Sequence, residues 1–148
     1  MVGVFDVLYH RNVGDDAIAA RECLRVLKPG GAIVVTDSAL GILAGPHDVA
    51  MHGARRYSAR GIRELLAGAG FAVERAGYGN FLLFPVAGPW RAPPAMVRRR
   101  RHLGALGCLP APAWINGILG FVYGAEAFLL RFADLPIGTS IIAIARKP

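Results

Sequence analysis

The sequence predicts an α/β domain in which short apolar strands alternate with amphipathic helices. Residues 2–9 and 32–36 are apolar runs of strand length, and a helical pattern lies between them. A second helical pattern precedes a third apolar run that begins at Phe71. Because the run at 32–36 does not alternate with polar residues, we expect a strand buried on both faces, in a parallel or mixed sheet covered by helices.

The first helix is predicted between the first two strands. Asp15 or Asp16 can cap its amino end by accepting backbone N–H groups. Lys28 places a cation near the last carbonyl groups, and Pro29 cannot continue a helix. The helix would bury one face, which carries Ala17, Ala20, Leu24 and Leu27 at helical spacing.

Turn and cap residues mark the later elements. Gly30 or Gly31 can adopt the positive φ that a turn before residue 32 requires. Ser58 can cap a second helix, and Gly70 is its expected stop. The last strand is expected within residues 135–148, and the predicted buried face of the second helix consists of Ile62, Leu65, Leu66 and Ala69.

A helical insertion, about residues 85–133, is expected before the last strand. Its first part holds most of the prolines. Residues 113–132 are apolar over a length that could cross a bilayer, but Glu126, Arg131 and internal glycines argue against a span. We expect a helix packed on the domain, which covers an apolar substrate pocket or lies at a lipid interface.

Composition sets limits on the class of protein. The chain has 148 residues, of which 54% are hydrophobic and 18% charged, with a net charge of +7. This apolar content excludes a disordered chain and predicts one domain with a core. The run Arg98 to Arg101 is expected to be a solvated helix face, with contact to an anionic lipid or phosphorylated substrate as the alternative. No nucleic-acid binding is expected, because the aromatic residues are not interleaved with this run.

The expected compartment is the cytoplasm, with a peripheral position at the membrane as the alternative. Cys23 and Cys108 have neither zinc-ligand spacing nor a disulfide pattern. The first ten residues do not combine a basic region with a long apolar core, so no signal peptide is expected.

Three blocks of sequence share their order and spacing with a known family. They are "FDVLYH", "RVLKPGGAIVV" and "HDVAMHGARRYSARGIRELLAGAGFAVER", and "LPIGTSIIAIARKP" closes the match. Over nearly the whole chain, they resemble the carboxyl-terminal half of the class I S-adenosylmethionine-dependent methyltransferases. The resemblance implies a partial Rossmann-like fold, in which this chain supplies strands four to seven of a mixed sheet. Strand seven would run antiparallel between strands five and six.

The same resemblance implies that strands one to three lie upstream of Met1, together with the Gly-rich loop that holds the cofactor. No G-x-G-x-G motif follows any predicted strand here. The complete protein is expected to bind S-adenosyl-L-methionine, whereas this chain alone is expected to be inactive. The strand edge at residues 2–9 is expected to pair with the missing amino-terminal half or with another chain.

The resemblance places Asp6, Val7 and Leu8 beside the methionine part and sulfonium of the cofactor. A carboxylate near a cation is physically sensible, and the alternative for Asp6 is a turn or cap residue. His10 is a candidate base on the acceptor, because imidazole titrates near neutral pH, or else a hydrogen-bonding histidine. Methyl transfer is an in-line displacement, so positioning alone can supply much of the rate.

A second group of residues is expected on the substrate side. His47, Asp48 and His52 are favoured as part of a substrate-side loop over a structural network or a metal site, so no metal is predicted. Arg55 and Arg56 either pair with Asp48 or bind an anionic acceptor, and the pairing is favoured. The group as a whole consists of His47, Asp48, His52, Arg55, Arg56, Tyr57, Tyr78 and Asn80, the last two facing the pocket or solvent.

The leading functional prediction is methyl transfer to a small or lipid-like acceptor. Two rivals come from other classes. One is a non-catalytic remnant or interaction module that pairs through its exposed strand edge. The other is a peripheral membrane protein held by residues 98–131.

Overall fold

The computed structural model describes residues 1–40, 52–84 and 112–148. Strands and helices alternate along these residues, which confirms the expected α/β class. Predictions for His47, Asp48, Cys108, the run Arg98 to Arg101 and the first part of the expected insertion lie outside the described residues. In chain order, the elements are β1 (Val2–Phe5), α1 (Asp16–Val26), β2 (Ala32–Ser38), α3 (Ala59–Ala69), β3 (Ala72–Gly79), α6 (Ala113–Leu129) and β4 (Ser140–Arg146).

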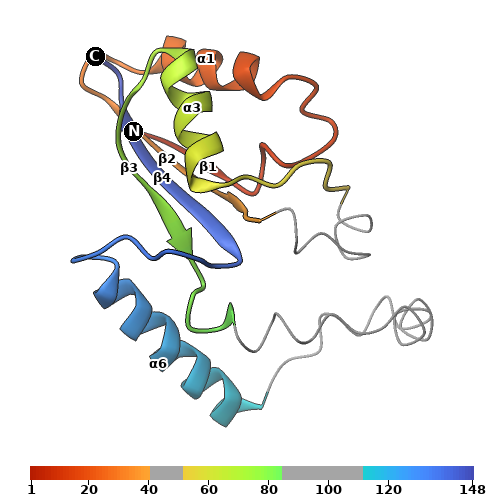
Figure 1. Cartoon of the computed structure of the whole chain (residues 1–148), viewed down its shortest axis with the longest axis vertical. Helices are drawn as coiled ribbons and strands as arrows, with labels where there is room; N and C mark the ends of the chain where they lie inside the picture. Colours follow the sequence, from red (N-terminus) through yellow and green to blue (C-terminus); the bar gives the residue numbers. More distant parts are fainter. Residues whose placement is uncertain (41–51, 85–111) are drawn as a thin grey trace.

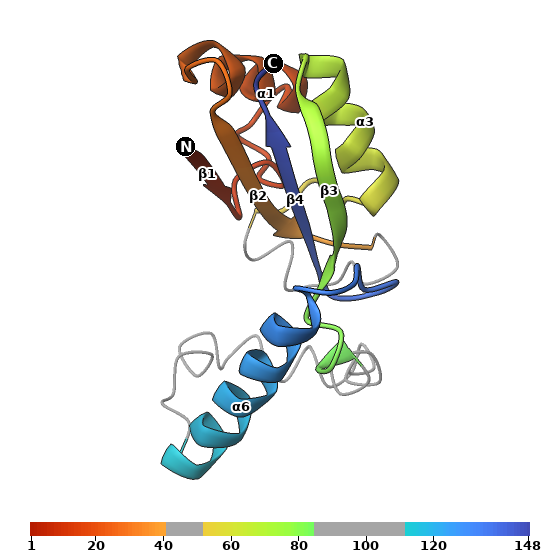
Figure 2. The same ribbon diagram turned by 90° about the vertical axis from the view of Figure 1, so that its left-hand side faces the viewer.

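The strands form one mixed sheet in the order β1-β2-β4-β3 (Figure 2). β1 runs parallel to β2, and β4 runs antiparallel to both of its neighbours. The last strand therefore lies inside the sheet, whereas β1 is at an edge. The carboxyl ends of β2 and β3 lie at the end of the sheet nearest to α6 (Figures 1 and 2).

The first strand is shorter than the predicted run of residues 2–9. β1 ends at Phe5 because Asp6 adopts a left-handed conformation, with φ of 53°. This turns the chain out of the strand direction, while the Asp6 N–H still donates to the Thr36 carbonyl at 2.8 Å. The exposed strand edge is accordingly limited to four residues.

Local capping follows the sequence pattern closely. The Asp15 carboxylate accepts two backbone N–H groups of the first turn of α1, at 2.8 and 3.1 Å. The Ser58 hydroxyl accepts the Gly61 N–H at 3.0 Å, and Gly70 ends α3 with a φ of 104°. These three predictions are confirmed, with Asp15 rather than Asp16 as the cap.

The turn after α1 is held by the end of the chain. Gly30 takes the positive φ, at 74°, and a β-carbon on Gly31 would lie 2.8 Å from the Lys28 carbonyl oxygen. The cation that bonds the last carbonyls of α1 is not Lys28. It is Lys147, whose ammonium donates to the Leu24 and Leu27 oxygens at 2.9 and 2.8 Å. Two backbone hydrogen bonds of 2.9 Å join Lys147 to the same glycines.

The two faces of the sheet differ. Both α1 and α3 lie on one side of it (Figure 1), so residues that point to that side are buried. The prediction of a strand buried on both faces is wrong for β2, where burial alternates along the strand. The reason is that no described helix covers the other face as α1 and α3 cover theirs. Residues half-buried on that open face include Val34, Thr36, Ile142 and Ile144.

The helix α6 lies apart from α1 and α3, beyond the ends of β2 and β3 (Figures 1 and 2). Among the described residues, no helix has the length and apolar character needed to cross a bilayer. Glu126 is the buried residue of α6, at 4% exposed. The other side of the helix exposes large apolar side chains.

Candidate functional site

The loop after β1 presents the three residues that the resemblance assigns to the cofactor. Asp6 is exposed, and Val7 is 44% exposed. Leu8, at 3% exposed, packs in the core, so its side chain is not available to a ligand. The hydrogen bond from Asp6 to Thr36 fixes this loop at the carboxyl end of β2. Asp6 and Val7 thus lie together at the open edge of the sheet.

A buried carboxylate, Asp37, accepts a hydrogen bond from the backbone of the loop after β1. Asp37, near the end of β2, is 1% exposed. Its oxygens accept the backbone N–H groups of Ser38 at 2.8 Å and Tyr9 at 3.2 Å. Burial raises the pKa of Asp37, against the opposing effect of these hydrogen bonds, and the charge of Asp6 raises it further. Asp37 therefore positions the loop backbone.

Residues 52–57 form hydrogen bonds with the same loop after β1. The Tyr57 hydroxyl lies 2.8 Å from an Asp16 carboxylate oxygen and 3.2 Å from the Leu8 carbonyl oxygen. Burial, followed by the contact with Asp16, raises the pKa of Tyr57. Arg55 donates to the carbonyls of Val13 and Gly14 at 2.7 and 2.8 Å.

The side chains of Arg55, Arg56 and Tyr57 form hydrogen bonds within the protein. Arg55 also lies 4.0 Å from an Asp16 carboxylate oxygen, and Arg56 donates to the Ala39 carbonyl at 2.7 Å. The favoured pairing partner, Asp48, lies outside the described residues. These hydrogen bonds attach both arginine side chains to the protein's own backbone, and the choice between Asp48 and an anionic acceptor stays a prediction.

The two described histidines of the predicted site come together. The rings of His10 and His52 lie 5.8 Å apart, edge to face. His10 Nδ1 accepts the Asn12 N–H at 3.2 Å. The role of His10 as a base on the acceptor stays a prediction. Among residues 1–40, 52–84 and 112–148, no group of three or more side chains has the arrangement of a metal site.

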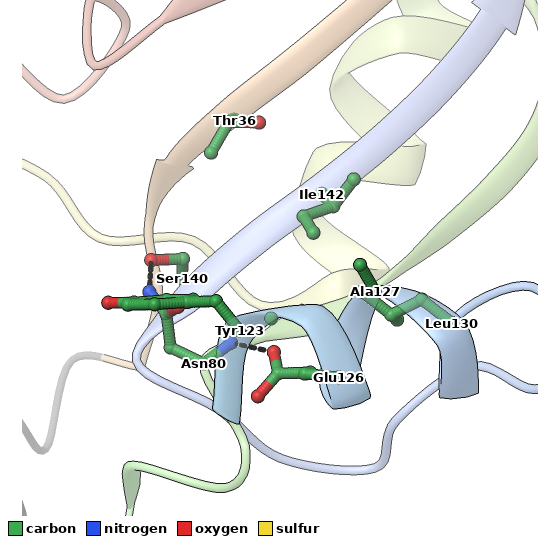
Figure 3. A pocket seen from close by; sticks show the side chains of 9 residues that line it. Thr36, Asn80, Tyr123, Glu126, Ala127, Leu130, Ser140 and Ile142 are labelled. Atoms are coloured by element: carbon green, nitrogen blue, oxygen red, sulfur yellow. Dashed lines mark hydrogen bonds between the residues drawn. The ribbon is translucent and has the colours of Figure 1, made fainter. Parts of the chain in front are cut away.

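A pocket of about 190 Å³ lies on the open face of the sheet, between the strand ends and α6 (Figure 3). Most of its surface is apolar, with polar groups at a few points. Thr36 connects it to the loop after β1, because the Thr36 carbonyl binds Asp6. The pocket is lined by Thr36, Gly79, Asn80, Tyr123, Glu126, Ala127, Leu130, Ser140 and Ile142.

Glu126 and Asn80 form hydrogen bonds at one side of this pocket. Asn80 has a left-handed φ of 59°, and its side-chain amide donates to Ser140 Oγ at 2.8 Å. One carboxylate oxygen of Glu126 accepts the Asn80 N–H, and the other accepts the Leu82 N–H at 3.0 Å. Figure 3 shows the contacts that join Asn80 to Ser140 and Glu126. These bonds attach α6 to the end of β3.

The predicted residues thus separate into two places. Asn80 lines the pocket, and Arg56 contacts Ala39 after β2. His10 belongs to the loop after β1, which His52, Arg55 and Tyr57 contact. Tyr78 belongs to neither: it packs against the core, and its hydroxyl accepts the Ala59 N–H at 3.2 Å.

Sequence reasoning did not select Thr36, Asp37, Ser140 or Glu126 for the site. A usable signal existed for Thr36 and Asp37, which are polar residues at the end of an apolar strand. No local pattern distinguishes Glu126, whose burial depends on contacts with residues more than forty positions away.

Comparisons with known proteins give similarity of fold. No protein-family model and no curated protein matches the sequence. Among solved structures, the chain is similar to the [4+2]-cyclase SpnF, with 22% identity and a TM-score of 0.52 over 99% of this chain and 48% of that chain.

It is also similar to a chain of the complex between the Haloferax volcanii Trm112 methyltransferase activator and "the putative methyltransferase". Here the identity is 19% and the TM-score 0.51, over 99% of this chain and 53% of that chain. The chain therefore spans about half the length of both solved structures. At these identities the likeness concerns the fold alone. The chain has a methyltransferase-like α/β fold.

Proposed function

We propose that this chain forms one wall of an S-adenosylmethionine-dependent methyltransferase site and helps to transfer a methyl group to a small or lipid-like acceptor. The observation that carries the proposal is the position of Asp6. It is an exposed carboxylate in a left-handed turn at the carboxyl end of edge strand β1. In open α/β sheets, ligands bind outside the carboxyl ends of strands, where the winding order reverses.

The cofactor side of the site would be completed across the edge of β1. Within the described residues, β1 pairs with β2 alone and its other edge has no partner strand. A further strand beside β1 would turn this edge into one wall of a crevice. Asp6 and Val7 would then face the cofactor, where a carboxylate favours the positive sulfonium.

The acceptor side would lie at the pocket on the open face. Its volume of about 190 Å³ is below the roughly 300 to 1,000 Å³ of a complete ligand pocket, in keeping with a partial wall. The apolar lining suits an apolar acceptor, and the hydroxyl groups of Thr36 and Ser140 provide hydrogen bonds that can orient it. Orientation matters here because in-line displacement rewards alignment of the reacting atoms.

Cofactor binding tests this proposal. Calorimetric titration would compare the affinity of two proteins for S-adenosylmethionine. One is residues 1–148, and the other is the same chain with the residues encoded in frame upstream of Met1. We expect saturable binding by the extended chain and none by residues 1–148. Asp6→Asn in the extended chain should weaken binding about tenfold, or about 1.4 kcal/mol, whereas Glu22→Gln on the exposed side of α1 should not.

Three outcomes would count against the proposal. Micromolar binding by residues 1–148 alone would contradict the need for a second wall. Equal affinity of the Asp6→Asn variant would remove Asp6 from the cofactor site. An upstream frame without a strand and Gly-rich loop would favour the rival, an interaction module that pairs through β1, where Phe5 is 61% exposed.

A further inference from the structure

One side of α6 carries large apolar side chains that are exposed to solvent. Trp114, Ile118, Phe121, Phe128 and Phe132 are 68%, 56%, 78%, 59% and 75% exposed. Their spacing of three, four or seven residues places them on one side of a helix, and Phe132 extends the row just past the last turn. Phe128 and Phe132 contact each other edge to face, with ring centroids 5.1 Å apart. We call these five residues the outer stripe.

The opposite side of α6 attaches the helix to the protein. Tyr123, Glu126, Ala127 and Leu130 line the pocket on the open face of the sheet (Figure 3). They lie about half a helical turn from the outer stripe at 100° per residue. The stripe therefore points away from the sheet. The outer stripe does not contribute to the contacts that attach α6 to the sheet. A contiguous row of large exposed apolar side chains is unusual on a surface that has no partner.

The charges around the stripe favour an anionic partner. The one carboxylate on α6 is Glu126, which is buried and accepts two backbone N–H groups. Asp134, shortly after the helix, is ion-paired with Arg75. Arg131 is exposed beside Phe132, and within the described residues its guanidinium forms no ion pair. The whole chain carries a net charge of +7.

We propose that the outer stripe inserts into the surface of an anionic lipid membrane, with α6 lying along the interface. Tryptophan and phenylalanine are typical of the apolar side of interfacial helices, and a nearby cation adds attraction to anionic headgroups. A helix of 17 residues suits this position, because interfacial helices are not restricted to one length. A second copy is disfavoured as the occupant, because it would bring another positively charged chain to the same surface.

Vesicle flotation tests this proposal with the 148-residue chain. Phosphatidylcholine vesicles with about 30% phosphatidylserine are the probe, and pure phosphatidylcholine is the reference. We expect binding to the anionic vesicles that weakens with salt. The triple variant Trp114→Ser, Phe121→Ser and Phe132→Ser should lower the partition coefficient at least about tenfold. Arg131→Gln should lower it about two- to fivefold.

A matched control removes exposed apolar side chains elsewhere. Ile18 and Val26 on α1 are 56% and 58% exposed, so Ile18→Ser with Val26→Ser should leave flotation unchanged. Circular dichroism checks that each variant is folded. The proposal is overturned if the wild-type chain does not float or if both sets of variants bind equally. It is also overturned if the triple variant instead abolishes a concentration-dependent dimer, as measured by sedimentation without vesicles. None of these measurements depends on methyl transfer.

Discussion

The helices α3 and α6 use their apolar residues in opposite ways. In α3, Ile62 and Leu66 are fully buried against the sheet, while charged residues such as Arg60 and Glu64 face solvent and pair with each other. In α6, large apolar residues face solvent, and the buried residue is the carboxylate of Glu126. Both helices are attached to the same sheet, but only α3 is attached by a hydrophobic face.

Apolar composition and burial are therefore separate properties of a helix. In an amphipathic helix such as α3, the spacing of the apolar residues predicts which side is buried. A helix with apolar residues on more than one side, such as α6, can dock through either of these sides. Here the docked side is determined by hydrogen bonds from the loop after β3 to Glu126.

The largest expected effect comes from a matched pair of leucines. Leu66→Ala in α3 removes a side chain that is 0% exposed and should lower the free energy of unfolding by about 2 to 5 kcal/mol. Leu129→Ala in α6 removes one that is 44% exposed and should cost about 1 kcal/mol or less. Urea unfolding measures both. Equal losses would contradict the opposite use of the two helices.

A matched pair of glutamates should give the next largest effect. Glu126→Gln replaces one accepting oxygen with an amide that must face a backbone N–H, at a cost of about 1 to 3 kcal/mol. Amide hydrogen exchange at Asn80 and Leu82 should accelerate as α6 loosens. Glu64→Gln on the exposed side of α3 should change neither quantity by much. Unchanged exchange in the Glu126 variant would show that another contact holds α6.

The smallest expected effect concerns the other buried carboxylate, Asp37, and its dependence on pH. Burial raises the pKa of Asp37 above its ordinary value of 3.8, so the folded state binds this proton more tightly than the unfolded state. The resulting stabilisation is present below pH 3.8 and is lost as pH rises through the raised pKa. The charges nearest to this group include Asp6, which acts in the same direction.

The measurement is the free energy of unfolding of the wild-type chain and of Asp37→Asn, from about pH 3 to about pH 7. The stability of the wild type relative to the variant should fall as pH rises. A constant or rising difference would mean that the hydrogen bonds from Ser38 and Tyr9 outweigh burial in setting this pKa.

Features that depend on neighbouring residues were predictable from the sequence. The caps at Asp15 and Ser58 and the left-handed stop at Gly70 need only a few adjacent residues. The alternation of strands and helices was predictable for the same reason. The end of β1 at Asp6 was not, because a non-glycine residue in the left-handed region is held there by the bond to Thr36 in another strand.

Features that depend on distant contacts could not be predicted. The bonds from Lys147 to the end of α1 join residues about 120 positions apart, so sequence proximity pointed wrongly to Lys28. For the candidate site, the apolar pattern placed Asp6 inside the expected strand of residues 2–9, and only the resemblance assigned it to a ligand site. The commitment of Arg55 to carbonyls was not predictable, since an arginine that binds a ligand has the same local sequence. His47 and Asp48 stay predictions.

The position of β4 between β2 and β3 has a consequence for the order of assembly during synthesis. β3 joins the sheet only through β4, and β2 has no other antiparallel partner among the described strands. Until Arg146 has left the ribosome, β2 and β3 therefore present unpaired edges and an apolar surface that α1 and α3 alone cannot shield. The nascent chain is expected to need chaperone protection until β4 arrives and joins β2 to β3.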